Sequence, residues 1–281
     1  MKSSLAAVDG VELPYTVEGT GMPTLVTCDA VVAQRAFSQK LREHLQFVFM
    51  EPRVGLKYEQ SVDYSAITMD TIVRDIERVR EHLGLENIAV VGHSTCGILA
   101  LEYARRYPEN VSNVIMIGTP PGWTVDMTAA SDEYWYAHAS EDRKAVLSQN
   151  EGALSEDSLK QLTPSEAQWA RYMAHTPKYW HDPRYDASSL IEGQYWNVEG
   201  WGHFFGVIMA DYDITTGGEI GVPTFLALGR HDYVVPPVLW DDVRGRFPTL
   251  SQVVFEKSGH YPHLEEQALF DQVLLEWIRS H

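Results

Sequence analysis

One short segment in the first half of the chain has the features of an exposed nucleophile. Residues Gly92–Gly97, with the sequence Gly-His-Ser-Thr-Cys-Gly, follow a β-branched apolar run and precede a helical pattern. A sharp turn from a strand into a helix needs small residues two positions before and after its central residue. Gly92 and Cys96 meet that need on either side of Ser94. We therefore expect Ser94 to present its hydroxyl at the start of a helix, where the helix end stabilises developing negative charge.

A serine hydroxyl is a weak nucleophile at neutral pH and needs an adjacent base. His260 comes shortly after an apolar run at 253–255, and Asp232 comes shortly after another at 223–228. If both runs are parallel strands, these side chains lie at the same edge of the sheet as Ser94. We expect His260 to be the base and Asp232 to be the acid that orients it.

Other readings of these residues are less well supported. His231 is the nearest competitor for the base, but it lies in the turn before Asp232. Asp211 and Asp213 have no strand directly before them. The plainer alternatives are a chance Gly-x-Ser turn, a surface-loop histidine and a turn-forming aspartate.

Apolar runs alternate with helical patterns along most of the chain, which predicts a mostly parallel sheet flanked by helices. The chain begins with a β-hairpin pattern around Asp9-Gly10. The pattern predicts strands at 23–27, 46–50, 88–91, 114–117, 223–228 and 253–255, and helices at 34–45, 69–85, 98–107 and around 270–277.

This alternation stops between about Pro120 and Gly218, where the chain is largely helical and irregular. We interpret 1–119 and 219–281 as one core and 120–218 as an inserted helical cap over the catalytic edge. The cap is rich in aromatic residues, which favours a largely apolar pocket, although we expect more than half of its Trp and Tyr residues to form its own core. Six of the eight tryptophans lie in it: Trp123, Trp135, Trp169, Trp180, Trp196 and Trp201.

The composition narrows the classes of partner and location. With 44% hydrophobic and 22% charged residues, the chain is typical of a globular protein. A formal net charge of −17 disfavours nucleic acid as a partner. No stretch approaches the apolar length of a membrane span, and the N-terminus lacks the pattern of a signal peptide. We therefore expect a cytoplasmic location and, because disulfides are rare there, free thiols at Cys28 and Cys96. Cys28 ends one central strand and Cys96 opens the helix after the next, so both should lie near Ser94, and an oxidised pair stays open if their Cα atoms lie within about 7 Å.

Together these segments resemble the α/β-hydrolase family, and within it the prolyl iminopeptidases and their relatives. The resemblance implies the α/β-hydrolase fold, the order serine, acid, histidine in the triad, and an oxyanion hole made by the backbone N–H groups of Ala30 and Thr95. The matching segments are Glu51–Gly55, Asp75–Arg80, Leu83–Leu85, Val91–Ser94 and Gly229–Pro236.

The chain departs from that family beside the nucleophile. Where relatives place His-Gly-Gly, this chain has Cys28-Asp29-Ala30, and Thr95 replaces a tryptophan that iminopeptidases often have. We therefore treat Cys28, Asp29 and His93 as candidate pocket residues. Asp29 has two alternatives: it turns away and caps the loop through a backbone N–H, or it faces the pocket as a binding or acid–base group.

These residues predict a serine hydrolase that cleaves an ester, amide or related carbonyl bond of a small molecule through an acyl-enzyme. The predicted chemistry requires no metal and no organic cofactor. A non-hydrolytic reaction on the same fold, as in a lyase or a cofactor-free cyclase, stays open, because the site and not the fold sets the function. A ligand-binding receptor with a vestigial triad is the third alternative.

Overall fold

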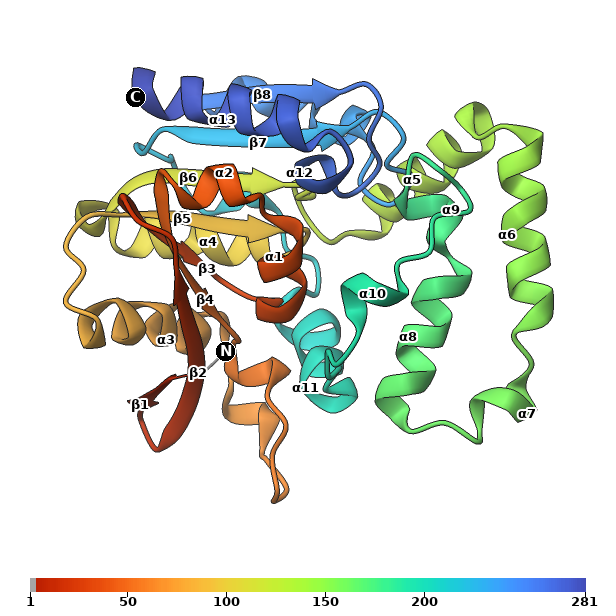
Figure 1. The fold of residues 1–281 in the computed structure, drawn as a ribbon, viewed down its shortest axis with the longest axis horizontal. Helices are drawn as coiled ribbons and strands as arrows, with labels where there is room; N and C mark the ends of the chain where they lie inside the picture. The colour runs from red at the N-terminus through yellow and green to blue at the C-terminus, as the bar shows by residue number, and fades with distance from the viewer. Residues whose placement is uncertain (1–3) are drawn as a thin grey trace.

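The computed structural model describes residues 4–281, which form one eight-stranded sheet with helices around it (Figure 1). Across the sheet the strand order is β1-β2-β4-β3-β5-β6-β7-β8. The strands are β1 (Ser4–Val8), β2 (Val11–Glu18), β3 (Met22–Val26), β4 (Leu45–Met50), β5 (Ile88–His93), β6 (Val111–Ile117), β7 (Thr224–Gly229) and β8 (Leu250–Phe255).

The sheet is antiparallel only at its first edge. β1 and β2 form the expected hairpin, whose turn places Asp9 and Gly10 at φ of 46° and 80°. β2 also pairs with β4 in an antiparallel sense, and every later pairing is parallel. The mostly parallel sheet predicted from the sequence is therefore confirmed.

Helices cover both faces of the sheet, which explains why its central strands are apolar on both sides. In β5, Ile88 and Val90 pack into the core on one face of the sheet, whereas Ala89 and Val91 pack into the core on the other face. The helices are α1 (Ala30–Ala36), α2 (Gln39–Arg42), α3 (Met69–His82), α4 (Cys96–Arg106), α5 (Val125–His138), α6 (Glu141–Ala153), α7 (Glu156–Leu159), α8 (Pro164–Ala174), α9 (Thr176–Tyr179), α10 (Ser188–Ile191), α11 (Val198–His203), α12 (Pro262–Glu265) and α13 (Gln267–Ser280).

The single helix expected at 34–45 is wrong, because the chain forms two shorter helices there. Phe37 is extended, and the Ser38 hydroxyl accepts a hydrogen bond from Leu41 N–H at the start of α2. The Arg42 guanidinium donates to the carbonyl oxygens of Phe37 and Ser38, which satisfies backbone acceptors at the break. These contacts are local hydrogen bonds between polar side chains and the backbone, which a search for apolar periodicity does not detect.

Helices α5 to α11 all lie between β6 and β7 in the sequence and gather beyond the carboxyl ends of the parallel strands (Figure 1). A backbone bridge between Gly122 and Asp213 joins the two ends of this segment. The elements of the segment therefore stand at the edge of the sheet where the residues after β5, β7 and β8 converge.

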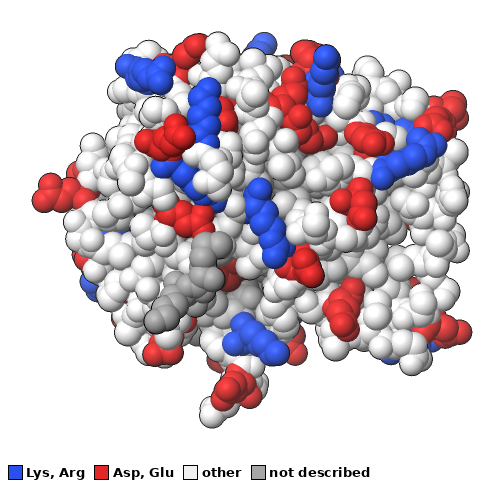
Figure 2. Space-filling model, in the orientation of Figure 1, with Lys and Arg blue, Asp and Glu red and all other residues white. Residues whose placement is uncertain are grey.

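Acidic and basic side chains are interspersed on the face of the molecule that Figure 2 shows. Among the helices within residues 4–281, none has the length and apolar character needed to cross a membrane.

Candidate active site

Ser94 occupies a strained turn between β5 and α4. Its φ is 55°, in the left-handed region that a residue with a side chain rarely adopts. Its N–H donates to Ile117 O on β6 at 2.8 Å, and its carbonyl accepts from Gly97 N–H at 3.0 Å. A side chain at Gly92 would collide with the Cys96 carbonyl, so the turn needs glycine there. These contacts hold the serine above the edge of the sheet.

His260 and Asp232 form a buried hydrogen-bonded pair. His260 Nδ1 donates to Asp232 Oδ2 at 2.6 Å, and both side chains are almost fully buried. The second carboxylate oxygen, Oδ1, accepts from the backbone N–H groups of Val234 and Val235 at 2.9 and 2.7 Å. This pairing fixes the imidazole tautomer with its proton on Nδ1, which leaves Nε2 as the basic nitrogen.

Ser94 and His260 line one cavity of about 440 Å³. Aromatic side chains from the segment between β6 and β7 supply much of its wall, and Asp29, His93, Thr95 and Cys96 also reach it. Four of the six tryptophans in that segment take part, as do two of its tyrosines. These tryptophans and tyrosines are Trp123, Trp169, Trp196, Trp201, Tyr172 and Tyr179, and Phe205 of the same segment also lines the cavity.

His93 lies beside the base rather than acting as one. Its Nε2–H donates to His260 O at 2.9 Å, and its ring packs 4.4 Å from the Tyr261 ring, centre to centre. Burial, together with neighbouring His260 and His263, holds the pKa of His93 well below its usual value. His93 is therefore a neutral packing and hydrogen-bonding partner of the loop that carries His260.

Only one of the two expected oxyanion donors is free. The Thr95 N–H has no hydrogen-bond acceptor within residues 4–281. The Ala30 N–H instead donates to Glu51 Oε2 at 3.2 Å, and Ala30 does not line the cavity. The expectation that Ala30 presents a free donor is wrong, because Glu51 reaches across from the end of β4 and accepts that N–H.

Asp29 faces the cavity. It has φ 55°, stands directly before α1 and makes no capping hydrogen bond, so the capping alternative is wrong. Burial raises the pKa of Asp29 to about 6, although the electrostatic interaction with His260 acts to lower it. Burial and the charge of Asp29 raise the pKa of Glu51 to about 8, although the hydrogen bond from Ala30 acts in the other direction. The two carboxyl groups therefore lie close enough to interact, and Asp29 is the one that lines the cavity.

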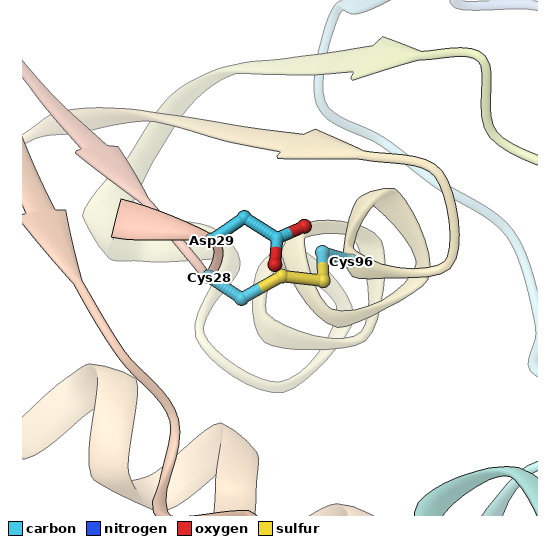
Figure 3. A group of neighbouring side chains, drawn as sticks. All are labelled: Cys28, Asp29 and Cys96. Carbon is cyan, nitrogen blue, oxygen red and sulfur yellow. A yellow bond between two sulfur atoms is a disulfide. The ribbon is translucent and has the colours of Figure 1, made fainter. Parts of the chain in front are cut away.

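Cys28 and Cys96 are joined by a disulfide, and Asp29 lies beside it (Figure 3). Their Cα atoms are 6.1 Å apart, a normal separation for a bridge. The expectation of free thiols is therefore wrong: it followed from the expected compartment, whereas the fold brings the two residues within bonding reach. Cys28 itself does not line the cavity, since its sulfur turns toward Cys96.

The sulfur atoms of Cys28 and Cys96 and a carboxylate oxygen of Asp29 lie within 4.8 Å of one another. Such a trio contains ligand types that zinc accepts. With both sulfurs in a disulfide, however, the trio offers no thiolate, and thiolate is the form that binds a metal. The sequence-based expectation of a metal-free site stays a prediction.

Comparison with known proteins assigns the family. The model of the alpha/beta hydrolase fold family matches residues 39–267. AB hydrolase superfamily protein YclE of Bacillus subtilis (strain 168) is 34% identical over 283 residues, which cover 99% of each chain. The chain belongs to the α/β-hydrolase fold family.

Other members of the α/β-hydrolase family show how its activities vary. A proline iminopeptidase of Lactobacillus delbrueckii subsp. bulgaricus is 27% identical over 77% of this chain and 73% of its own. The structure of an esterase from Exiguobacterium antarcticum superposes with a TM-score of 0.66 at 21% identity, over 99% of this chain and 100% of the esterase. The resemblance to the iminopeptidase group is thus confirmed, and the family supports hydrolase activity in general terms.

Within this α/β-hydrolase, three residues that support the site were missed from the sequence. Glu51 was noted only as part of a turn motif, yet it binds the loop beside the nucleophile. The Tyr179 carbonyl accepts the His260 N–H at 2.5 Å. Gly118, with φ 54°, leaves room for the imidazole, since a Cβ there would lie 3.0 Å from His260 Nδ1. Only Gly118 had a sequence signal, a glycine directly after an apolar strand.

Proposed function

We propose that the protein is a serine hydrolase that cleaves an ester, amide or related carbonyl bond of a small molecule. Ser94 is the nucleophile, His260 Nε2 takes the proton from its hydroxyl, and Asp232 stabilises the imidazolium. His260 then returns the proton to the leaving group. Water attacks the acyl-enzyme with His260 again as base, which releases the acid and restores Ser94.

The negative oxygen of the tetrahedral intermediate needs donors near Ser94. We assign the Thr95 N–H to this role, at the start of α4, and such a donor contributes about 3 kcal/mol. The Ala30 N–H can add to it only by sharing with Glu51. Residues 120–218 serve in this proposal as the cap, whose aromatic side chains enclose a largely apolar substrate.

The observation that carries the proposal is the left-handed turn at Ser94 on the wall of the cavity that also contains His260. A serine costs free energy in that conformation, and strain of this kind is concentrated at functional sites. A serine with a purely structural role would gain nothing from this strained backbone conformation.

Covalent labelling tests the nucleophile. An organophosphonate should label the native protein, and Ser94→Ala should abolish the label and lower kcat by about 10⁴-fold or more. Ser131→Ala is the matched control, because Ser131 lines the same cavity but its hydroxyl bonds to the carbonyl oxygens of Met127 in α5 and Val234 in the loop after β7. Retained labelling in Ser94→Ala, or its loss in Ser131→Ala alone, contradicts the assignment.

One observation also favours a non-hydrolytic reaction as a second candidate. Asp29 faces the cavity and could move a proton on substrate atoms away from Ser94. Turnover in ¹⁸O-labelled water separates the two functions, since hydrolysis places the label in the acid product and a lyase or cyclase does not. A receptor would give no turnover of any ester.

A further inference from the structure

We propose that the substrate carries a positively charged amine and that Asp29 binds it inside the catalytic cavity. This inference names the substrate class of the proposed hydrolase and rests on that function for the identity of the bond that is cleaved. The binding step itself does not depend on turnover, so it can be tested separately.

The first support is that Asp29 lacks a cationic partner. No Lys or Arg within residues 4–281 forms an ion pair with Asp29 or Glu51, and no described donor bonds to the Asp29 carboxylate. The other aspartate of the cavity, Asp132, is paired with Lys178 at 3.4 Å. A carboxylate withdrawn from water needs a proton or a cation, because its hydration is lost. Asp29 is therefore a cavity carboxylate with no Lys or Arg partner within residues 4–281, and a ligand cation would stabilise it.

The second support is the position of Asp29 relative to Glu51. Glu51 Oε2 accepts the Ala30 N–H at 3.2 Å, and Glu51 Oε1 is buried with no hydrogen-bond partner among the described residues. Burial raises the pKa of both carboxyl groups, and the charge of Asp29 raises that of Glu51 further. Asp29 lines the cavity and Glu51 does not, so Asp29 is the carboxyl group of the two that a ligand cation can reach.

The third support is the aromatic wall around this charge. Burial raises the phenol pKa values of Tyr172 and Tyr261, and both lie near enough to Asp29 for its charge to add to this rise. Both phenols stay neutral, and the Tyr172 hydroxyl donates to the Tyr261 oxygen at 3.1 Å. Trp169 packs edge-on against Tyr172, 5.6 Å between ring centres. Electron-rich ring faces next to a carboxylate are a favourable environment for an organic ammonium group.

The alternative is that Asp29 binds a proton instead of a ligand cation. In that case the neutral carboxyl would donate a hydrogen bond to the oxyanion, and activity would need Asp29 in its acid form. The groups that face Asp29 are His260, Glu51, Tyr172 and Tyr261, and none of them supplies a permanent positive charge. The two alternatives give opposite pH dependence, which makes them separable.

Binding to the Ser94→Ala protein, measured by calorimetry, tests the proposal without turnover. The probes are two matched ester pairs, acetylcholine with 3,3-dimethylbutyl acetate and phenylalanine methyl ester with methyl 3-phenylpropanoate. In each pair the shapes are similar and only the first member is cationic. We expect the cation to bind about 10- to 100-fold more tightly than its neutral partner, as for a hydrogen-bonded or aromatic-enclosed charge. A larger affinity ratio for the acetylcholine pair would indicate a site for a quaternary ammonium, and a larger ratio for the phenylalanine pair would indicate a site for a protonated amine.

Asp29→Asn in the same background should bring the ratio to about one, because asparagine keeps the size and loses the charge. Asp132→Asn is the matched control and should retain the ratio, since Lys178 already pairs with that carboxylate. In the parent, the preference for the cation should weaken as pH falls through about 6, where Asp29 becomes protonated.

Equal affinity within both pairs, no measurable binding of either ammonium ester, or a ratio that survives Asp29→Asn would overturn the proposal. A preference that grows at acid pH would favour the proton alternative. If the ammonium esters bind as expected but organophosphonate fails to label Ser94, the binding site stands and the hydrolase proposal fails.

Discussion

Reduction of the Cys28–Cys96 disulfide is expected to lower the stability of the protein and to loosen the catalytic site. The bridge links the loop after β3 to the first residue of α4, directly beyond Ser94 and Thr95. The Thr27 hydroxyl strengthens the same junction by donating to Cys96 O at 2.9 Å. Both the stability of the fold and the position of the oxyanion donor therefore depend on this link.

The magnitude follows from the length of chain that the bridge closes. The two cysteines are 68 residues apart in the sequence. A cross-link of that span removes loop entropy from the unfolded chain worth about 4 kcal/mol at 25 °C. The unfolding entropy of a chain of 281 residues is about 0.6 kcal/mol per kelvin, so the melting temperature should fall by about 7 °C.

The assay compares thermal unfolding of the protein with and without a thiol reductant. The Cys28→Ser/Cys96→Ser double variant is the control: it should melt near the reduced protein and should not respond to reductant. Thiol titration of unfolded protein should give none before reduction and two after it. In the reduced form kcat should fall more than KM rises, because the Thr95 N–H acts on the transition state.

Two results would refute this reasoning. Two reactive thiols in unfolded, unreduced protein would show that the bridge is absent. A melting temperature that is the same in the oxidised, reduced and double-variant proteins would show that the link does not constrain the unfolded chain.

Two further substitutions test individual contacts. Asp232→Asn should lower kcat by about 10⁴-fold, because the asparagine favours the wrong imidazole tautomer of His260. The melting temperature should stay close to that of the parent, because asparagine still offers an oxygen to the N–H groups of Val234 and Val235. A kcat within tenfold of the parent value would contradict the triad. Folding raises the pKa of Glu51 from 4.5 to about 8, so its ionisation costs native-state stability as pH rises across that range. Glu51→Gln removes that cost and keeps an oxygen for Ala30 N–H. The melting temperature of Glu51→Gln minus that of the parent should increase from pH 4.5 to 8 and should be constant below pH 4.5. If this difference is constant across the whole pH range, Glu51 does not titrate as a buried group.

Features that depend on local periodicity could be predicted from the sequence. The apolar runs at β5 and β7 are long enough to be recognised, and the rule that functional residues follow strand ends then selects Ser94 and Asp232. The His260–Asp232 hydrogen bond agrees with that selection, although the two residues are 28 positions apart. Functional residues can be located from strand ends because a parallel sheet brings the carboxyl ends of all its strands to one edge.

Features set by tertiary distances could not be predicted in the same way. The strand ends place Cys28 and Cys96 near Ser94, but their bridge depends on the distance that the adjacency of β3 and β5 sets, and the expected compartment led to the wrong choice of free thiols. The contact between Glu51 and Ala30 joins residues on either side of β4, and no periodic pattern relates them. Trp180 and Trp169 are alike in the sequence, yet Trp180 is fully buried in a separate core and Trp169 lines the cavity.

The charges of the site constrain the proposed reaction and the proposed substrate together. Attack by Ser94 creates a negative oxygen near Thr95, in the same cavity that already contains the Asp29 carboxylate. In a site of low dielectric constant two negative charges repel strongly, so the barrier for a neutral ester is raised. A substrate ammonium bound by Asp29 removes that repulsion and adds attraction to the developing oxyanion. The selectivity for a charged substrate is therefore expected in kcat as well as in KM, because the cation interacts with a charge that exists only in the transition state.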